Sequence, residues 1–266
     1  MIGISVLKKD FHTFVTYKLN FLMTIVSIFI YCFVIFEFSS NFSSGSTLGQ
    51  DTENLFLYFL AGLFVIDLTI TTTVKPPLVL SFYQTSGLVE EISHDFGIFL
   101  KSYSALMLFP IIFSIIKILF YLIFGIIFFD LEVNINFADL NLIVYLVIYM
   151  LYLLGVCLLA ASFTIVFKRG NPVIQLNNLA TIILGGALFP TDSLNNFLSA
   201  IGNFLPGKHV IDKFRMAFLE DEQILLSLNM QFLEYSLSSL CVLIIGLVVF
   251  RYSFNHAKQL GIFSNY

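Results

Sequence analysis

The sequence predicts an all-helical protein that crosses a membrane several times, and three observations carry that prediction. Hydrophobic residues make up 58% of the 266 residues and charged residues only 11%, where an ordinary soluble domain has about 25% charged residues. A soluble domain of this length has too little core to bury so much apolar surface. The apolar residues lie in continuous runs of about 20, enough for a helix to cross a bilayer core of about 30 Å. These runs also lack the alternation of barrel strands.

Six apolar runs are predicted to span the membrane, within a single transmembrane domain that covers residues 1–266. They lie at 19–38, 55–74, 104–129, 142–167, 173–189 and 232–250. The second run is followed by Lys75-Pro76-Pro77, which is expected to end its helix because proline cannot continue one. The fifth run is short and contains Asn177 and Asn178, so we expect it to pack among other helices and not to face lipid.

The distribution of basic residues predicts that both termini are cytoplasmic. With the N-terminus inside, nine of the 13 basic residues fall in cytoplasmic segments: Lys8, Lys9, Lys18, Lys75, Lys101, Lys168, Arg169, Arg251 and Lys258. The short outside loops 39–54 and 130–141 contain none, and the longer outside segment 190–231 contains three. This excess of inside charge is typical of integral membrane proteins.

Residues 1–18 are expected to form an amphipathic helix on the membrane surface. Ile4, Leu7, Phe11, Phe14 and Val15 recur at helical spacing, which indicates one apolar face. Lysines on the other side of the helix would then lie near the head groups of membrane lipid. The alternative is a short basic flank that only fixes the topology.

The loop 75–103 is the longest predicted cytoplasmic segment, and it contains an acidic stretch. Gly87 is followed by Glu90, Glu91 and Asp95. We expect a short surface helix here, because an acidic and partly apolar helix that projects from the membrane is suited to docking another subunit. The alternative is a solvated turn between two spans.

The outside segment 190–231 is predicted to form two short amphipathic helices, arranged as a re-entrant hairpin before the last span. Their apolar positions follow helical spacing: Leu194, Phe197, Leu198 and Ile201 in the first helix, and Val210, Ile211, Phe214 and Phe218 in the second. Pro206-Gly207 separates the two helices, and Thr191 to Ser193 offer caps for the first. The alternative is a plain extracellular loop with some helical content.

Two ionisable residues are predicted at membrane depth, Asp67 in the second span and Lys117 in the third. Each costs about 2.5–3.5 kcal/mol at the bilayer centre, so each is expected to face protein or water. Their opposite charges permit an ion pair between neighbouring helices that serves packing alone. An ion-coupled secondary carrier that works through this pair is the alternative function.

The sequence lacks the common motifs of catalysis. It contains no Gly-x-x-x-x-Gly-Lys-Ser/Thr phosphate loop and no His-Glu-x-x-His pair. The four histidines are scattered along the chain, and the three cysteines, Cys32, Cys157 and Cys241, fall in predicted spans. We therefore expect no catalytic residue, no metal site and no cofactor in this chain, and no nucleic-acid partner.

The order of these parts resembles the membrane (permease) subunit of ABC exporters of the second class. Residues 87–92 (Gly-Leu-Val-Glu-Glu-Ile) are similar to the Gly-Thr-x-Glu-x-Leu coupling segment of that family. Residues 185–190 (Gly-Gly-Ala-Leu-Phe-Pro) are similar to the end of its fifth span. Pro206, Asp212 and Arg215 match its Asn-Pro-x5-Asp-x2-Arg stretch, with Leu205 in place of the usual Asn.

The resemblance implies partners that the chain itself does not contain. A permease of this class pairs with a second permease, either another copy in a homodimer or a different chain. It also binds two P-loop ATPase subunits, which bind ATP and Mg. In this chain Gly87, Glu90, Glu91 and Asp95 would contact the ATPase, so that the permease is a transport subunit and not an enzyme.

The resemblance also implies a direction and a broad class of substrate. The family exports drugs, lipids and glycans from the cytoplasm across the plasma (inner) membrane. The outer hairpin, with Pro190, Pro206, Asp212 and Arg215, would lie at the exit side. An amphiphilic, lipidic, drug-like or glycan substrate is therefore expected.

Overall fold

The computed structural model describes residues 2–45, 52–87, 95–129, 140–167, 172–187, 195–219 and 230–259. Within these ranges every regular element is an α-helix, which agrees with the predicted all-helical membrane protein. The helices are α1 (Ile2–Thr16), α2 (Lys18–Gly45), α3 (Thr52–Thr85), α5 (Phe96–Ala105), α6 (Leu108–Phe129), α7 (Leu140–Phe167), α8 (Pro172–Ile183), α9 (Asn196–Asn203), α10 (Pro206–Leu219) and α11 (Met230–Gln259).

Five stretches of the described chain are long and apolar enough to cross a membrane. They are Leu22–Asn41, Asn54–Thr85, Phe96–Ile127, Leu142–Phe167 and Met230–Gln259. The predicted fifth span, 173–189, differs, because α8 has only 12 residues and a helix of that length is about 18 Å long. A turn at Leu184 and Gly185 follows α8, and Gly186 has a φ of 72°. Six full spans are therefore not confirmed.

The prediction that Pro76-Pro77 ends the second span is wrong. Helix α3 continues through both prolines to Thr85 and is 34 residues long. Prolines are tolerated in membrane helices when neighbouring helices supply partners for the carbonyls that lose their backbone bonds. Residues on both sides of the prolines, Thr73 and Leu80, are buried, so neighbouring helices enclose this part of α3.

Among the described helices, α7 and α11 share the most extensive contact. A Cβ atom on Gly155 of α7 would lie 2.8 Å from the backbone of Leu243, and one on Gly246 of α11 would lie 2.5 Å from the carbonyl oxygen of Gly155. Glycines at such crossings let membrane helices approach until their backbones touch. The pair is therefore expected to move as one unit.

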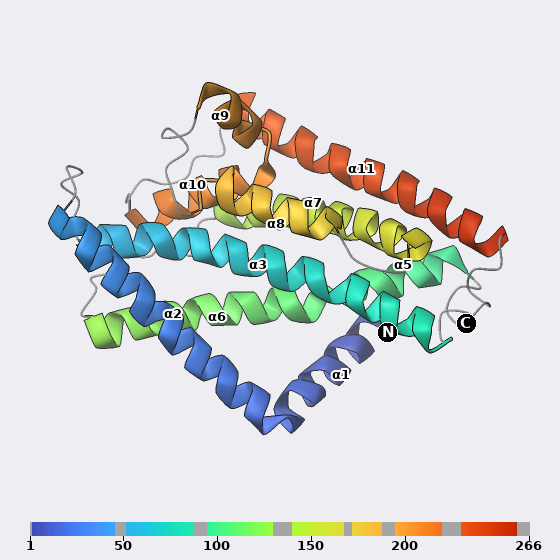
Figure 1. The fold of residues 1–266 in the computed structure, drawn as a ribbon, viewed down its shortest axis with the longest axis horizontal. Coiled ribbons are helices and arrows are strands. Elements are labelled where there is room, and N and C mark those ends of the chain that lie inside the picture. The colour runs from blue at the N-terminus through green and yellow to red at the C-terminus, as the bar shows by residue number, and fades with distance from the viewer. Residues whose placement is uncertain are drawn as a thin grey trace.

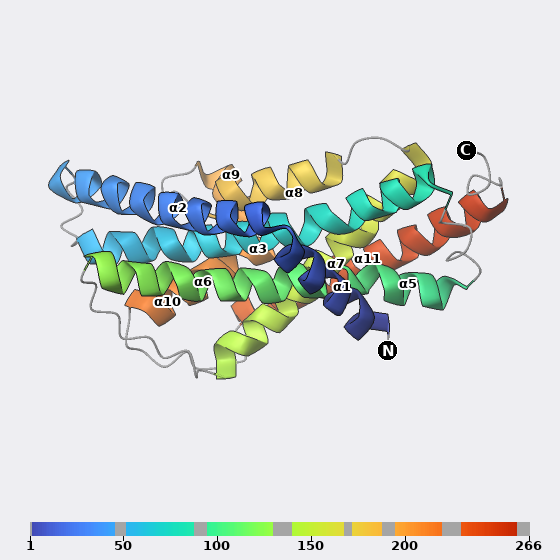
Figure 2. The same cartoon turned by 90° about the horizontal axis from the view of Figure 1, so that it is seen from below.

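The helices alternate in direction, so the ends that border the predicted cytoplasmic segments gather at one end of the bundle. The C-terminal ends of α3, α7 and α11 and the N-terminal end of α5 lie together at the right in Figures 1 and 2. This end carries Lys101, Arg251 and Lys258. The arrangement agrees with the alternation predicted from the basic residues, while the cytoplasmic placement of this end remains a prediction.

Helix α1 forms as expected and meets α2 at a sharp angle (Figure 1). Phe14 packs edge-on against Phe113 of α6, with 4.8 Å between ring centroids. Asp10 forms an ion pair with Lys75 of α3. Phe11 and Val15, on the other edge of the predicted apolar face, stay exposed. One edge of α1 therefore contacts protein, and the other is available to lipid.

Candidate functional site

Gly87 and Asp95 border the predicted coupling segment, and the structure assigns each a local role. Gly87 lies in a turn with a φ of 73°, a backbone conformation that residues other than glycine adopt only at a cost in free energy. Asp95 is the N-cap of α5, where its Oδ1 accepts a hydrogen bond of 2.9 Å from the Gly97 amide. Glu90 and Glu91 lie outside the described residues.

Replacement of Gly87 by Ala is expected to weaken the turn by about 1 kcal/mol, because the left-handed backbone penalises a Cβ atom. No atom of the described residues lies within 4 Å of the added Cβ, so the expected cost is one of backbone conformation. Hydrogen–deuterium exchange of the Ser86 amide, which donates to Phe82, should rise roughly fivefold in G87A and much less in G87N, since Asn tolerates this region. Equal exchange in G87A and the unmodified chain would contradict the assignment.

Helix α5, which follows the predicted coupling segment, packs against the α7–α11 pair. The rings of Phe96 and Phe99 pack on Phe250 and Phe254 of α11, and Phe99 stacks on Phe250 with 5.7 Å between centroids. The hydroxyl of Tyr103 donates a 2.9 Å hydrogen bond to the carbonyl oxygen of Cys157 in α7. The start of α5 is therefore firmly anchored.

The structure brings Asp67 and Lys117 together, 50 residues apart in the chain. Lys117 Nζ lies 2.8 Å from Asp67 Oδ1. Ser114 donates a 3.0 Å bond to the other carboxylate oxygen, Oδ2, and its hydroxyl oxygen lies 2.8 Å from that of Thr71. The side chains of Lys117 and Asp67 are 14% and 21% exposed. Each carboxylate oxygen thus has a donor, and the pair ties α3 to α6.

Arg215 of the outer hairpin is buried and fixes α10 to two other parts of the chain. Its Nη2 donates to the carbonyl oxygens of Gly186, at 2.7 Å, and Ala187, at 3.2 Å. Its Nε donates to the carbonyl oxygen of Tyr58 in α3, and the guanidinium lies 3.4 Å from the centroid of the Tyr58 ring. Burial lowers the pKa of Arg215 below its ordinary value.

The rest of the hairpin agrees in part with the predicted pair of helices. Pro206 is the first residue of α10, where its missing N–H costs no helix bond. Asp212 lies 3.8 Å from Arg215, and Pro190 lies outside the described residues. The predicted apolar positions of α10 are buried, whereas Phe197 of α9 is exposed. Helix α10 is thus a packed part of the bundle.

Comparison with known protein families decides the class of this architecture. The sequence model of the ABC-2 type transporter family matches residues 5–219. The chain belongs to the ABC-2 type transporter family. It is therefore an integral membrane protein and a transmembrane subunit of an ABC transporter, with an ABC ATPase as its partner. No curated protein matches the chain.

The family match runs from residue 5, within α1, to the end of α10 and covers every described candidate residue, while α11 follows it. In an ABC-2 subunit ATP hydrolysis takes place in a separate subunit. The carrier alternative, in which Asp67 and Lys117 move an ion, gains no support from this match. Their geometry is that of a satisfied ion pair between two helices.

Sequence reasoning missed a buried polar network between α3, α7 and α8 of this ABC-2 subunit. Thr69 shares a 2.6 Å hydrogen bond with Tyr149, Tyr152 donates to Asn177, and the Thr73 hydroxyl lies 3.5 Å from the Asn178 side-chain oxygen. The asparagines of the predicted fifth span indicated packing among helices, but their partners could not be read from the sequence. Helix α8 is thus attached to the bundle partly by uncharged polar groups.

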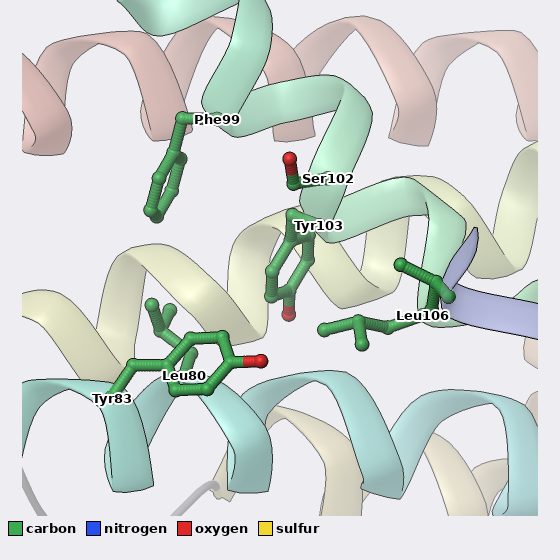
Figure 3. A pocket seen from close by; sticks show the side chains of 7 residues that line it. Leu80, Tyr83, Phe99, Ser102, Tyr103 and Leu106 are labelled. Carbon is green, nitrogen blue, oxygen red and sulfur yellow. The ribbon is translucent and has the colours of Figure 1, made fainter. Parts of the chain in front are cut away.

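A cavity of about 180 Å³ lies near the anchored start of α5. Its walls come from α3, α5 and α1, and Figure 3 shows Leu80 and Tyr83 of α3 opposite Phe99 and Tyr103 of α5. The cavity is lined mainly by apolar side chains, with Ser102 among the exceptions. Since protein interiors are otherwise close-packed, this cavity is a gap in the packing of α3 against α5 among the described residues.

Proposed function

We propose that the chain is the permease of an ATP-driven exporter and that residues 87–95 dock on the partner ATPase. The observation that carries this proposal is the family match over residues 5–219. The predicted coupling segment follows directly on α3. Gly87 forms a turn before the segment, and Asp95 caps the helix that follows it. These two features favour a fixed backbone conformation at both ends of the segment. Glu90 and Glu91 are the proposed contacts, and the ATPase supplies the bound ATP and Mg.

In the proposed complex, two permeases and two ATPase subunits lie on a common axis in the plasma (inner) membrane. Both termini of the permease and the end of the bundle that carries Lys101 and Arg251 face the cytoplasm, as the positive-inside rule favours. ATP-driven closure of the ATPase pair then moves the helix ends attached to the coupling segment. The second permease is another copy of this chain or a different chain.

An amphiphile is the proposed substrate class. Phe and Tyr account for 44 of the 266 residues (32 Phe and 12 Tyr), and their rings suit lipidic, aromatic or sugar surfaces. The outer hairpin lies at the opposite end of the bundle from α5, where a substrate would leave (Figure 1). A drug, a lipid or a lipid-linked glycan fits this description.

Charge reversal at the coupling segment tests the proposal. The E90K/E91K variant is expected to reduce the ATPase that co-purifies from native membranes at least about tenfold, because like charges replace the proposed contacts. The bound ATPase is detected by photolabelling with 8-azido-ATP. The matched control is E53K, which reverses an acidic charge at the opposite end of α3 and should leave the yield unchanged.

Two outcomes would contradict the proposal. Equal labelling in E90K/E91K and E53K would place the docking site elsewhere. Recovery of the tagged chain with no nucleotide-binding partner, under mild detergent conditions that keep other ABC complexes intact, would contradict the association itself.

A further inference from the structure

The two prolines inside α3 leave two carbonyls that the helix cannot satisfy, and α7 provides a substitute donor. Pro76 and Pro77 have no N–H groups, so the carbonyls four residues earlier, those of Thr72 and Thr73, lose their helical partners. The thiol of Cys157 lies 3.6 Å from the Thr72 oxygen and 3.9 Å from the Thr73 oxygen. One side chain of α7 therefore contacts both of the groups that the prolines release.

The substitute bond is weak, which is the property that a hinge requires. A thiol is a poor hydrogen-bond donor, so separating it from the carbonyls costs far less than breaking backbone N–H bonds in an apolar environment. Cys157 is fully buried in α7, and water has no ready access to the freed carbonyls. The two carbonyls thus have a hydrogen-bond donor in the observed state, but one that they can lose at little cost in free energy.

The turn before the prolines carries further signs of a weakened helix. Thr69, Thr71 and Thr73 each donate a side-chain hydrogen bond to the carbonyl four residues earlier, at 2.6, 2.6 and 2.7 Å. Such bonds compete with the backbone ladder and favour bending. The buried hydroxyl of Thr72 has no hydrogen-bond partner in the described chain. Bending is therefore concentrated in residues 69–77.

Cys157 also contacts the helix on the other side of the coupling segment. Its carbonyl oxygen accepts the hydrogen bond from Tyr103 of α5, while its thiol faces α3. The two helices that flank residues 88–94 thus meet at one residue of α7. Because α7 is held by the Gly155–Gly246 contact to α11, this residue belongs to the rigid part of the bundle.

The cavity gives the end of α3 a space into which it can move. Leu80 and Tyr83 lie beyond the prolines and face the cavity from α3, and Phe99 and Ser102 face it from the anchored α5 (Figure 3). A helix end that borders empty volume can shift without compressing a packed core. We call residues 78–85 the distal arm of α3.

We propose that Pro76-Pro77 is a hinge in α3, with Cys157 as its fixed contact, through which the partner ATPase swings the distal arm towards α5 and closes the cavity. This inference rests on the proposed coupling function, since the arm leads into the segment that docks on the ATPase. The α5–α7–α11 assembly stays in place while the arm moves. Movement at the coupling segment thereby reaches residues 69–77, within the membrane-spanning part of α3.

Distance measurements between spin labels test the hinge in the assembled complex. Labels are attached at F82C on the distal arm and Y252C on α11, because both side chains are largely exposed. The background is C241S, which removes the exposed thiol, while Cys32 and Cys157 are buried. The complex, in lipid nanodiscs with its co-purified ATPase, is compared with and without ATP and vanadate. ATP and vanadate should change the distance.

Removal of the prolines should suppress that change. P76A/P77A restores two backbone bonds, so the nucleotide-dependent change in distance should fall by more than half while ATPase binding persists. The matched control is P172A, at the first residue of α8, where no carbonyl loses a partner; it should behave as the unmodified complex does. S102L, which fills the cavity, should also reduce the movement. The hinge would be overturned if the nucleotide-dependent change in distance were the same in P76A/P77A as in the unmodified complex. It would also be overturned if the unmodified complex, with ATPase bound, showed no change in distance.

A second measurement needs no partner and separates failure of the hinge from failure of the proposed function. Hydrogen–deuterium exchange of residues 78–82 in the isolated full chain in nanodiscs should slow at least about fivefold in P76A/P77A, as two restored backbone bonds require, and stay unchanged in P172A. C157A should speed this exchange and C157S should restore it, because serine keeps a donor.

If no ATPase co-purifies but these shifts appear, the coupling function fails and the hinge stands. If the exchange is the same in all variants, the hinge is overturned whatever the chain binds.

Discussion

The R215M variant is expected to lose about 3–5 kcal/mol of free energy of unfolding. Methionine fills a similar volume but donates no hydrogen bond, so the carbonyl oxygens of Gly186, Ala187 and Tyr58 lose the donors that Arg215 provides. Each unsatisfied buried acceptor costs about 1–3 kcal/mol. The contact between the guanidinium and the Tyr58 ring is lost as well.

Unfolding of the purified chain in mixed detergent micelles by titration with SDS measures this loss. R215K keeps the charge but cannot reproduce the fork of donors, so its stability should lie between those of R215M and the unmodified chain. The matched control is R251M, at an exposed arginine of α11, which should change stability by no more than about 0.5 kcal/mol. Equal losses in R215M and R251M would contradict the structural role of Arg215.

Replacement of Lys117 by Met is expected to cost about 2.5–3.5 kcal/mol, because it leaves the Asp67 carboxylate without its counter-ion at membrane depth. The D67N/K117M double variant should recover most of that loss, since the remaining groups are neutral and the amide oxygen introduced by D67N can still accept from Ser114. The same SDS titration of the unmodified chain, K117M, D67N and D67N/K117M yields four free energies of unfolding, and from these the coupling between the two positions. Additive losses would contradict a direct pair.

The double variant also separates a packing role from an ion-transfer role. If the pair only joins α3 to α6, D67N/K117M should keep its ATPase partner and the nucleotide-dependent movement of the distal arm. If D67N/K117M were stable and bound to the ATPase but showed no nucleotide-dependent movement of the distal arm, the charges themselves would take part in transport.

The sequence was sufficient for the parts of the fold that depend on composition and periodicity. Five of the six predicted apolar runs lie in helices long enough to cross a membrane. The amphipathic α1 and the helices α9 and α10 also follow from local patterns and are present in the structure. Helix α3 was predicted to stop at Pro76 because the rule for proline is local. The neighbour that lets it continue, Cys157, is 81 residues away in the chain, and no local pattern reveals it.

The candidate residues were predictable to different degrees. Opposite charges in two spans indicated that Asp67 and Lys117 could meet, but the roles of Ser114 and Thr71 needed the register between α3 and α6. Arg215 was singled out by a motif alone, and its contacts to Gly186 and Tyr58 depend on how three helices pack. Asp95 was predicted to contact the partner ATPase, and this stays a prediction; the structure adds that its carboxylate caps α5.

The glycine contact between α7 and α11 has a consequence for the order of assembly. Gly155 and Gly246 are separated by 90 intervening residues, so this helix crossing cannot form until α11 has been synthesised and inserted. Until then the α7 surface at Gly155 and the ring of Tyr103 lack the neighbours that they have in the finished protein. During biosynthesis the helices that precede α11 therefore lack this contact until α11 has been inserted.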